Sequence, residues 1–196
     1  MKQYTDYIDE QLIDRCSIGE SKLVHLYPHM IDCMKLDGAV AELGVYRGGT
    51  FKFMARVARD FGKLVFGFDT FTGTPFKDEC DVHNLGDFQH PLSGFETVKQ
   101  FLGDLDNIRL IKGIFVADII AKMQIDEEFC FVHIDVDQYR STAEGLMYFY
   151  PRMVSGGKII LDDYTFDSCP GVEIAAKELG HNVVKISALQ GMIIAP

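Results

Sequence analysis

Two strongly apolar runs in this chain each end in a pair of aspartates. The runs are FCFVHIDVD at residues 129–137 and GGKIILDDY at residues 156–164. Such runs are typical of strands that are buried on both faces of a parallel sheet. Adjacent strands lie about 4.8 Å apart, so carboxylates at neighbouring strand ends can share one cation, and without one they repel each other. The pattern predicts a metal site at this edge of the sheet, formed from Asp135, Asp137, Asp162 and Asp163.

From residue 39 onward, short apolar runs alternate with helical patterns. The runs predict strands at 39–43, 64–68, 108–112, 129–134, 158–161, 183–186 and 192–195. The helical patterns lie at 50–61, 94–102, 116–123, 141–153 and 171–179. The link at 187–191 is too short for a crossover helix, so the last two strands should be antiparallel. We therefore expect an α/β, Rossmann-like fold with a seven-stranded, mostly parallel sheet and a C-terminal antiparallel hairpin.

The segment before the first strand is helical in pattern. Residues 4–35 carry apolar positions at helical spacing and predict two short helices with a break near 17–20. We expect a single domain overall, with an N-terminal helical segment at 1–37 and the α/β domain at 38–196. The polar, Gly- and Pro-containing stretch at 69–93 is long for a loop, which indicates a lid or a binding segment. We expect its two histidines, His83 and His90, to lie in solvent rather than at a substrate.

Composition limits the partners. The net charge of −10 argues against nucleic acid, because proteins that bind it usually carry a basic face. The sequence contains no apolar run of the ~18 residues that a membrane span needs. Its N-terminus is polar and unlike a secretion signal, so we expect a cytoplasmic protein without a membrane partner. The five cysteines are scattered without a CxxC pair, which favours buried thiols over a zinc knuckle. The sequence leaves the oligomeric state open, and a homo-oligomer is compatible with it.

A glycine-rich turn, AELGVYRGGT, follows the first expected strand at residues 41–50. Gly44, Gly48 and Gly49 permit a tight turn and close approach to a ligand, and the helix behind them presents free N–H groups. The spacing is GxxxGG and not the GxGxxG of dinucleotide-binding proteins. Glu42 would repel a pyrophosphate but suits an ammonium group. Taken alone, the turn is as consistent with a structural role as with ligand binding.

The second expected strand ends in GFDTF, which places Asp69 just past its carboxyl end. An acidic residue at this point typically accepts hydrogen bonds from ribose hydroxyls. The alternative is a turn or helix-capping aspartate. A nucleoside that carries an ammonium group and is not a dinucleotide describes S-adenosyl-L-methionine (SAM).

Several motifs together resemble the macrocin O-methyltransferase family. In chain order they are AELGVYRGGT, GFDTFTGTP, GDF, HIDVDQYRST and YPRMVSGGKIILDDY, and the resemblance covers roughly residues 38–180. Members of that family are SAM- and Mg²⁺-dependent enzymes that methylate sugar hydroxyls of antibiotics and related natural products. The resemblance implies a class I methyltransferase fold, SAM and Mg²⁺ as cofactors, and a small-molecule hydroxyl acceptor.

The resemblance also assigns roles to individual residues. The metal ligands match Asp135, Asp162 and Asp163, and the general base matches Asp137. In such an enzyme Mg²⁺ lowers the pKa of a bound hydroxyl and an aspartate accepts its proton. The cofactor-binding positions match Glu42, Gly44, Tyr46, Gly48, Thr50, Asp69, Phe71 and Asp135.

Other readings stay open at this point. An NAD-dependent oxidoreductase could use Asp69 equally well, although the GxGxxG spacing is missing from the sequence. A non-catalytic SAM-binding protein could retain the fold, and a catechol could replace the sugar as acceptor. Asp137 could serve as a turn residue or as a support for the metal ligands instead of as the base.

Overall fold

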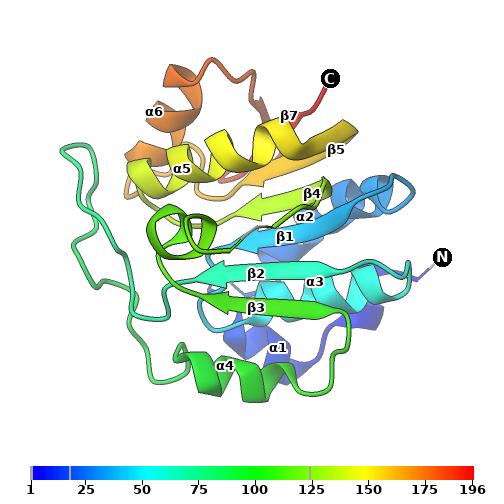
Figure 1. Ribbon diagram of the computed structural model, residues 1–196. Coiled ribbons are helices and arrows are strands. Elements are labelled where there is room, and N and C mark those ends of the chain that lie inside the picture. Colours follow the sequence, from blue (N-terminus) through cyan, green and yellow to red (C-terminus); the bar gives the residue numbers. More distant parts are fainter. Residues whose placement is uncertain (1, 18, 124) are drawn as a thin grey trace.

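The computed structural model describes residues 2–17, 19–123 and 125–196. In these residues a seven-stranded sheet has the order β3-β2-β1-β4-β5-β7-β6 (Figure 1). The strands are β1 (Ala39–Leu43), β2 (Val65–Asp69), β3 (Ile108–Lys112), β4 (Phe129–Ile134), β5 (Met153–Leu161), β6 (Val184–Lys185) and β7 (Gly191–Ile194). The helices are η1 (Tyr4–Tyr7), α1 (Glu10–Arg15), α2 (Ser21–Cys33), α3 (Gly49–Arg59), α4 (Phe95–Leu102), η2 (Phe115–Ile120), α5 (Tyr139–Phe149), η3 (Tyr150–Arg152) and α6 (Pro170–Glu178).

The sheet confirms the predicted topology. Strands β1 to β5 are parallel, whereas β7 is antiparallel to both β5 and β6. Strand β1 pairs with β2 on one side and with β4 on the other, so the strand order reverses between β1 and β4. In open α/β sheets, ligands bind outside the carboxyl ends of the strands at this reversal.

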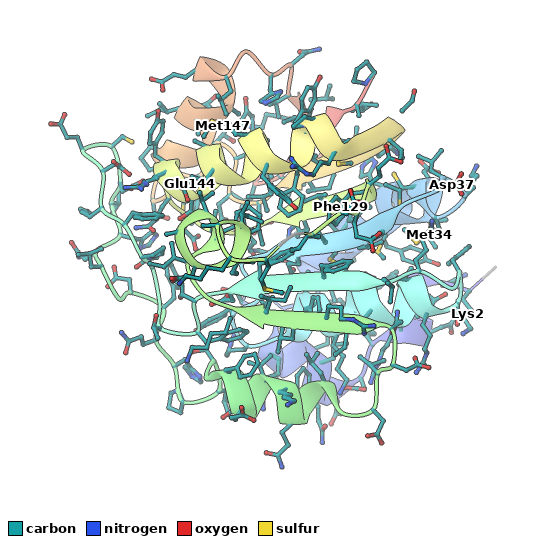
Figure 2. All side chains as sticks on the ribbon, viewed as in Figure 1. Lys2, Met34, Asp37, Phe129, Glu144 and Met147 are labelled. Atoms are coloured by element: carbon teal, nitrogen blue, oxygen red, sulfur yellow. The ribbon has the colours of Figure 1, made fainter. Side chains whose placement is uncertain are left out.

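Helices cover both faces of the sheet, which explains why its central strands are apolar throughout. One face packs against α1, α2, α3 and α4 in a core that includes Leu26, Phe53 and Phe131. The other face packs against η2, α5 and α6. Figure 2 shows Phe129 between α5 and the sheet, while Met147 on the outer side of α5 is 57% exposed. Among the described helices, none is both long and apolar enough to cross a bilayer.

The N-terminal segment forms the two predicted helices, α1 and α2. Residue 18, within the expected break, lies outside the described residues. Leu23, Leu26 and Met30 of α2 are fully buried and belong to the core on one face of the sheet. The segment is therefore packed against the sheet and contributes to its hydrophobic core.

Two predicted helices differ from the structure. The pattern at 141–153 predicted one helix, but α5 ends at Phe149 and a short 3₁₀ turn leads into β5, which begins at Met153. Pro151 accounts for this change, because proline lacks the N–H that a continuing α-helix requires. The pattern at 116–123 gives the π-helical turn η2 at Phe115–Ile120 in place of an α-helix.

Candidate active site

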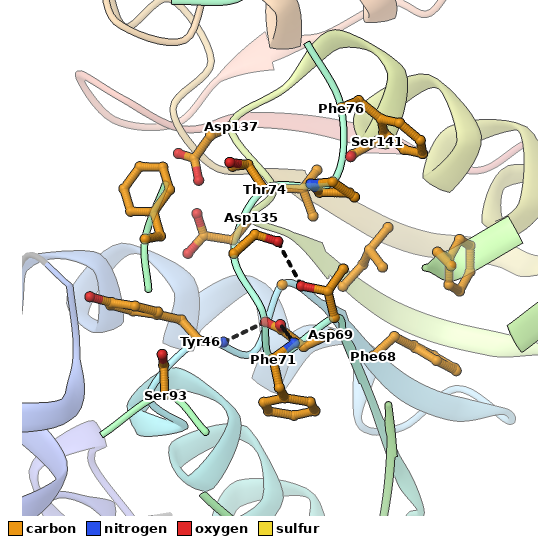
Figure 3. Close-up of a pocket in the computed structure, with 18 of the residues that line it drawn as sticks. Tyr46, Phe68, Asp69, Phe71, Thr74, Phe76, Ser93, Asp135, Asp137 and Ser141 are labelled. Atoms are coloured by element: carbon orange, nitrogen blue, oxygen red, sulfur yellow. Dashed lines mark hydrogen bonds between the residues drawn. The ribbon is translucent and has the colours of Figure 1, made fainter. Parts of the chain in front are cut away.

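A pocket lies at the carboxyl ends of β1, β2, β4 and β5, where the strand order reverses (Figure 3). Its walls come from the turn after β1, the long segment after β2, the turn after β4 and the end of β5. Ser17 and Lys22 of the N-terminal segment complete it. The predicted site residues that line the pocket are Gly44, Tyr46, Asp69, Phe71, Asp135, Asp137 and Asp163. The others, Glu42, Gly48, Thr50 and Asp162, are largely or fully buried behind this lining.

Five of the non-glycine lining residues have a left-handed backbone. The φ angles are 50° at Tyr46, 54° at Phe71, 65° at Phe88, 61° at Asp137 and 53° at Asp163. Each such angle costs a non-glycine residue about 1–2 kcal/mol, so it persists only where the surrounding structure imposes it. Strain of this kind concentrates at binding and catalytic sites, which supports a functional role for this pocket.

Asp69 organises the side of the pocket next to β2. Its Oδ2 accepts a hydrogen bond from the Tyr46 backbone N–H at 2.7 Å, and its Oδ1 accepts one from the Phe71 N–H at 2.6 Å (Figure 3). Burial raises the pKa of Asp69, and the backbone donors oppose this shift. Each carboxylate oxygen has a second lone pair and can accept one more hydrogen bond. The two backbone donors therefore fix the position of the Asp69 carboxylate, which lines the pocket.

Gly44 brings the glycine-rich turn against the end of β4. Its φ is +95°, and a Cβ at this position would lie 1.8 Å from the carbonyl oxygen of Asp135. The Asp135 N–H donates to the Leu43 carbonyl at 2.8 Å across the same junction. Only glycine permits this approach, which joins the turn after β1 to the acidic segment after β4.

Glu42 lies beneath the pocket. Its side chain is fully buried, and its Oε1 is 2.9 Å from Nδ1 of His133 on the adjacent strand β4. Burial raises the pKa of Glu42 to about 7. The second oxygen, Oε2, has no hydrogen-bond partner among the described residues. Glu42 therefore supports the strand ends from below, and its predicted contact with a cofactor ammonium stays a prediction.

Three of the four aspartates converge on the pocket. Oxygen atoms of Asp135, Asp137 and Asp163 all lie within 4.8 Å of one another. Burial raises the pKa of Asp137 well above its usual range, and the charges of Asp135 and Asp163 raise it further. The pKa of Asp163 is raised for the same two kinds of reason. Carboxylates held this close cannot all be ionised without a cation, so their oxygen-only donor set fits Mg²⁺.

The fourth aspartate, Asp162, does not line the pocket, although an oxygen of its carboxylate lies within 4.8 Å of ligand atoms of Asp135 and His133. Its Oδ1 accepts a hydrogen bond from Gln190 Nε2 at 2.9 Å, and its Oδ2 forms an ion pair with Lys22. The side chain of Lys22 is only 5% exposed, and its Nζ also lies 3.2 Å from Asp135 Oδ2. Burial lowers the pKa of Lys22, but the surrounding aspartates outweigh this effect and raise it above its usual value. Lys22 is not among the predicted site residues, although a lysine beside Leu23 and Leu26 on the apolar face of α2 is a sequence signal for a buried charge.

The long segment after β2 forms the outer wall of the pocket and extends beyond the strand ends in Figure 1. Thr74, Phe76 and Phe88 contribute to this wall. The Gln138 side chain bonds to the backbone of Phe76 in both directions. Asp81 Oδ1 accepts from the Tyr139 N–H at the start of α5, at 2.8 Å. The segment is therefore tied to the helix that follows the acidic turn.

The sheet order and the ligand pocket at its reversal define the class I methyltransferase fold. Solved structures agree. The O-methyltransferase NovP superposes with a TM-score of 0.76 at 22% identity, covering 92% of this chain and 82% of that chain. A calicheamicin methyltransferase superposes with a TM-score of 0.68 at 16% identity, covering 99% of this chain and 97% of that chain.

Sequence comparison then gives the family. The model of the macrocin-O-methyltransferase (TylF) family matches residues 6–183, and the chain belongs to this family. It is 31% identical over 146 residues to the 8-demethyl-8-(2,3-dimethoxy-alpha-L-rhamnosyl)-tetracenomycin-C 4'-O-methyltransferase of Streptomyces olivaceus. That match covers 67% of this chain and 55% of the relative, so the chain spans little more than half of its length. It is 26% identical to the mycinamicin III 3''-O-methyltransferase of Micromonospora griseorubida, over 82% of this chain and 69% of that protein.

Proposed function

We propose that the protein is a SAM- and Mg²⁺-dependent O-methyltransferase that acts on a hydroxyl of a sugar or a glycosylated small molecule. The observation that carries this proposal is the junction of Gly44 with Asp135, because it joins a nucleoside-type site to a cluster of carboxylates in one pocket. Family membership supports methyl transfer, and the names of the two curated relatives support a glycosidic acceptor.

SAM would lie between the turn after β1 and Asp69. It supplies a methyl group on a positively charged sulfur. A hydroxyl oxygen can attack this methyl carbon and displace the sulfur. Asp69 is placed to accept from the ribose hydroxyls, since the Tyr46 and Phe71 N–H groups hold both of its oxygens. Phe115 lines the same pocket and is stacked on Phe149, so it offers a fixed aromatic wall for the adenine. The role of these residues is to position the reacting groups.

Mg²⁺ would be held by Asp135 and Asp163, the two predicted ligands that face the pocket. When bound, it orients an acceptor hydroxyl and lowers its pKa as a Lewis acid. The third predicted ligand, Asp162, is paired with Lys22, so its recruitment requires the ammonium group to leave. In this arrangement Asp135 would contact the cofactor and the cation, and it also lies beside Lys22.

Asp137 would accept the proton of the acceptor hydroxyl. It lines the pocket beside Asp135 and Asp163, and its raised pKa suits a group that must hold a proton after transfer. Thr74 and Phe76 line the same pocket, in the segment that would contact the acceptor (Figure 3). A small-molecule acceptor and a cytoplasmic setting remain predictions from the sequence.

Mass spectrometry of +14 products from a panel of saccharide and phenolic acceptors tests the reaction. We expect methylated saccharides that form only with SAM and a divalent cation. Asp137→Asn should lower turnover by about 10²–10⁴-fold while leaving S-adenosylhomocysteine affinity unchanged. Asp104→Asn, at an exposed position after α4, is the matched control. Full activity of the Asp137 variant would remove it as the base. Binding of NADH without binding of S-adenosylhomocysteine would overturn the function itself.

A further inference from the structure

A second group of side chains that could hold a metal ion lies next to the acidic cluster, and two of its three members, His83 and Cys169, are not used by the proposed reaction. Atoms of His83, Asp137 and Cys169 all lie within 4.8 Å of one another. His83 belongs to the long segment after β2, and Cys169 immediately precedes α6. Residues far apart in the chain therefore present a nitrogen, an oxygen and a sulfur to one point.

The distances fit a tetrahedral metal ion. Cys169 Sγ lies 3.6 Å from His83 Nε2 and 3.4 Å from Asp137 Oδ1. A tetrahedral zinc ion with bonds of about 2.3 Å to sulfur and about 2.0 Å to nitrogen or oxygen separates its ligand atoms by about 3.5 Å. Without a metal, the Cys169 thiol donates to Asp137 Oδ1 and one tautomer of His83 donates its Nε2–H to Sγ; a bound cation would replace both protons at the same three atoms.

The surroundings of His83 are compatible with metal binding. Its Nδ1 lies 3.7 Å from Asp87 Oδ2, while Nε2 points to Cys169. Metal-binding histidines usually direct their second nitrogen to a carboxylate, which fixes the ring orientation. The ring is also packed edge-on against Phe88, with 4.7 Å between centroids. The side chain is only 20% exposed, so the expectation of a histidine in solvent is wrong for His83.

Cys169 favours a thiophilic cation over Mg²⁺. Its side chain is 1% exposed, and thiolate ligands select Zn²⁺ and related transition metals. Burial and the charges of Asp137 and Asp163 raise the pKa of the thiol, so the bound cation must displace its proton to the solvent. Three protein ligands leave a fourth coordination position for water or substrate. Because Asp137 lines the pocket, this open position would face the pocket.

We propose that His83, Asp137 and Cys169 form a binding site for Zn²⁺ or a similar transition metal, separate from the Asp135–Asp163 pair. If the proposed function holds, occupation of this site removes Asp137 from proton transfer and inhibits methylation. The site itself does not depend on that function, because it is defined by ligand chemistry alone.

Titration with Co²⁺ in the presence of excess Mg²⁺ tests the site. We expect a thiolate-to-cobalt charge-transfer band and the visible bands of tetrahedral Co²⁺, both lost on addition of Zn²⁺. Cys169→Ser should abolish the charge-transfer band, and His83→Gln should weaken Co²⁺ binding by at least about tenfold. Cys80→Ser, at a partly exposed thiol of the same segment, is the matched control and should retain the spectrum.

The outcomes separate cleanly. Absence of a charge-transfer band in the wild type, its persistence in the Cys169 variant, or its loss in the Cys80 variant overturns the proposal. The His83 variant guards against a misfolded Cys169 variant, because His83 lies on a loop and its replacement leaves the buried core intact. A cobalt spectrum without any detectable methyl transfer would support the metal site and count only against the proposed reaction.

Discussion

The ammonium group of Lys22 lies 3.2 Å from Asp135 and forms an ion pair with Asp162, so a helix outside the sheet neutralises two strand ends. Lys22 is thus a partner that the ends of β4 and β5 share. Asp162 turns to Lys22 and Gln190, while Asp163 turns to the pocket. Two consecutive aspartates therefore have different surroundings, since Asp163 lines the pocket and Asp162 does not.

Replacement of Lys22 by Met should destabilise the protein by about 3–5 kcal/mol, because it leaves buried carboxylates without their cation. Urea-induced unfolding in the presence of EDTA measures this loss. Lys177→Met is the control, since Lys177 is exposed and pairs with Glu173 one turn away, and it should unfold like the wild type. Mg²⁺ should restore part of the stability of the Lys22 variant. Equal stability of both variants would contradict the role of Lys22.

Asp69→Asn should weaken binding of S-adenosylhomocysteine by about 10–100-fold, because hydrogen bonds to a charged acceptor contribute about 1.5–3 kcal/mol. The amide can replace only one of the two oxygens that accept from Tyr46 and Phe71. Isothermal titration calorimetry gives the affinity directly. Asp104→Asn again serves as the control. An unchanged dissociation constant for the Asp69 variant would exclude this residue from the nucleoside site.

Gly44→Ala and Gly62→Ala form a matched pair, since both positions have positive φ angles. At Gly62 a Cβ meets no atom within 4 Å, so alanine should cost only about 1 kcal/mol of backbone strain. At Gly44 the added carbon collides with the Asp135 carbonyl, and the loss should reach at least about 3 kcal/mol. Chemical denaturation of both variants measures the difference. Similar losses in the two variants would show that the close approach contributes nothing.

Glu42 gives the protein a predictable pH dependence. Its pKa is about 7 in the folded state and 4.5 in the unfolded chain, so the folded state binds the extra proton between these values. Stability should therefore fall as the pH rises from about 4.5 to about 7, by up to about 3 kcal/mol. Unfolding curves across this range in EDTA measure the slope. Glu42→Gln should reduce the slope and leave the part that comes from the other buried carboxylates, whereas Glu96→Gln on the surface of α4 should not change it; an unchanged slope in the Glu42 variant contradicts the prediction.

The sequence predicted the sheet well because burial leaves a strong local signal. Strands β1, β3 and β4 have the predicted bounds, since each apolar run ends abruptly in polar or turn residues. Strand β5 begins at Met153 rather than at residue 158, because its first half is glycine-rich and is held by pairing with β4.

The site was less predictable because its contacts are long-range. The grouping of Asp135, Asp137 and Asp163 followed from strand order alone. The ion pair of Asp162 with Lys22 could not be predicted from strand order. Lys22 lies more than a hundred residues away in the sequence, and its position depends on how α2 packs. The proximity of His83 to Cys169 has the same origin, since nothing in the local pattern of the long segment fixes its path.

The bond between Gln138 and Phe76 has a practical consequence for altering the range of acceptors. Gln138 directly follows Asp137. Its hydrogen bonds to Phe76 therefore connect the wall that would select the acceptor to the carboxylate that would take its proton. Lengthening or exchanging the segment at 70–93 would disturb the hydrogen bonds between Gln138 and Phe76 as well as reshape the wall. Laboratory evolution of new specificities should therefore vary side chains such as Thr74 and Phe88 while leaving the backbone length and Gln138 unchanged.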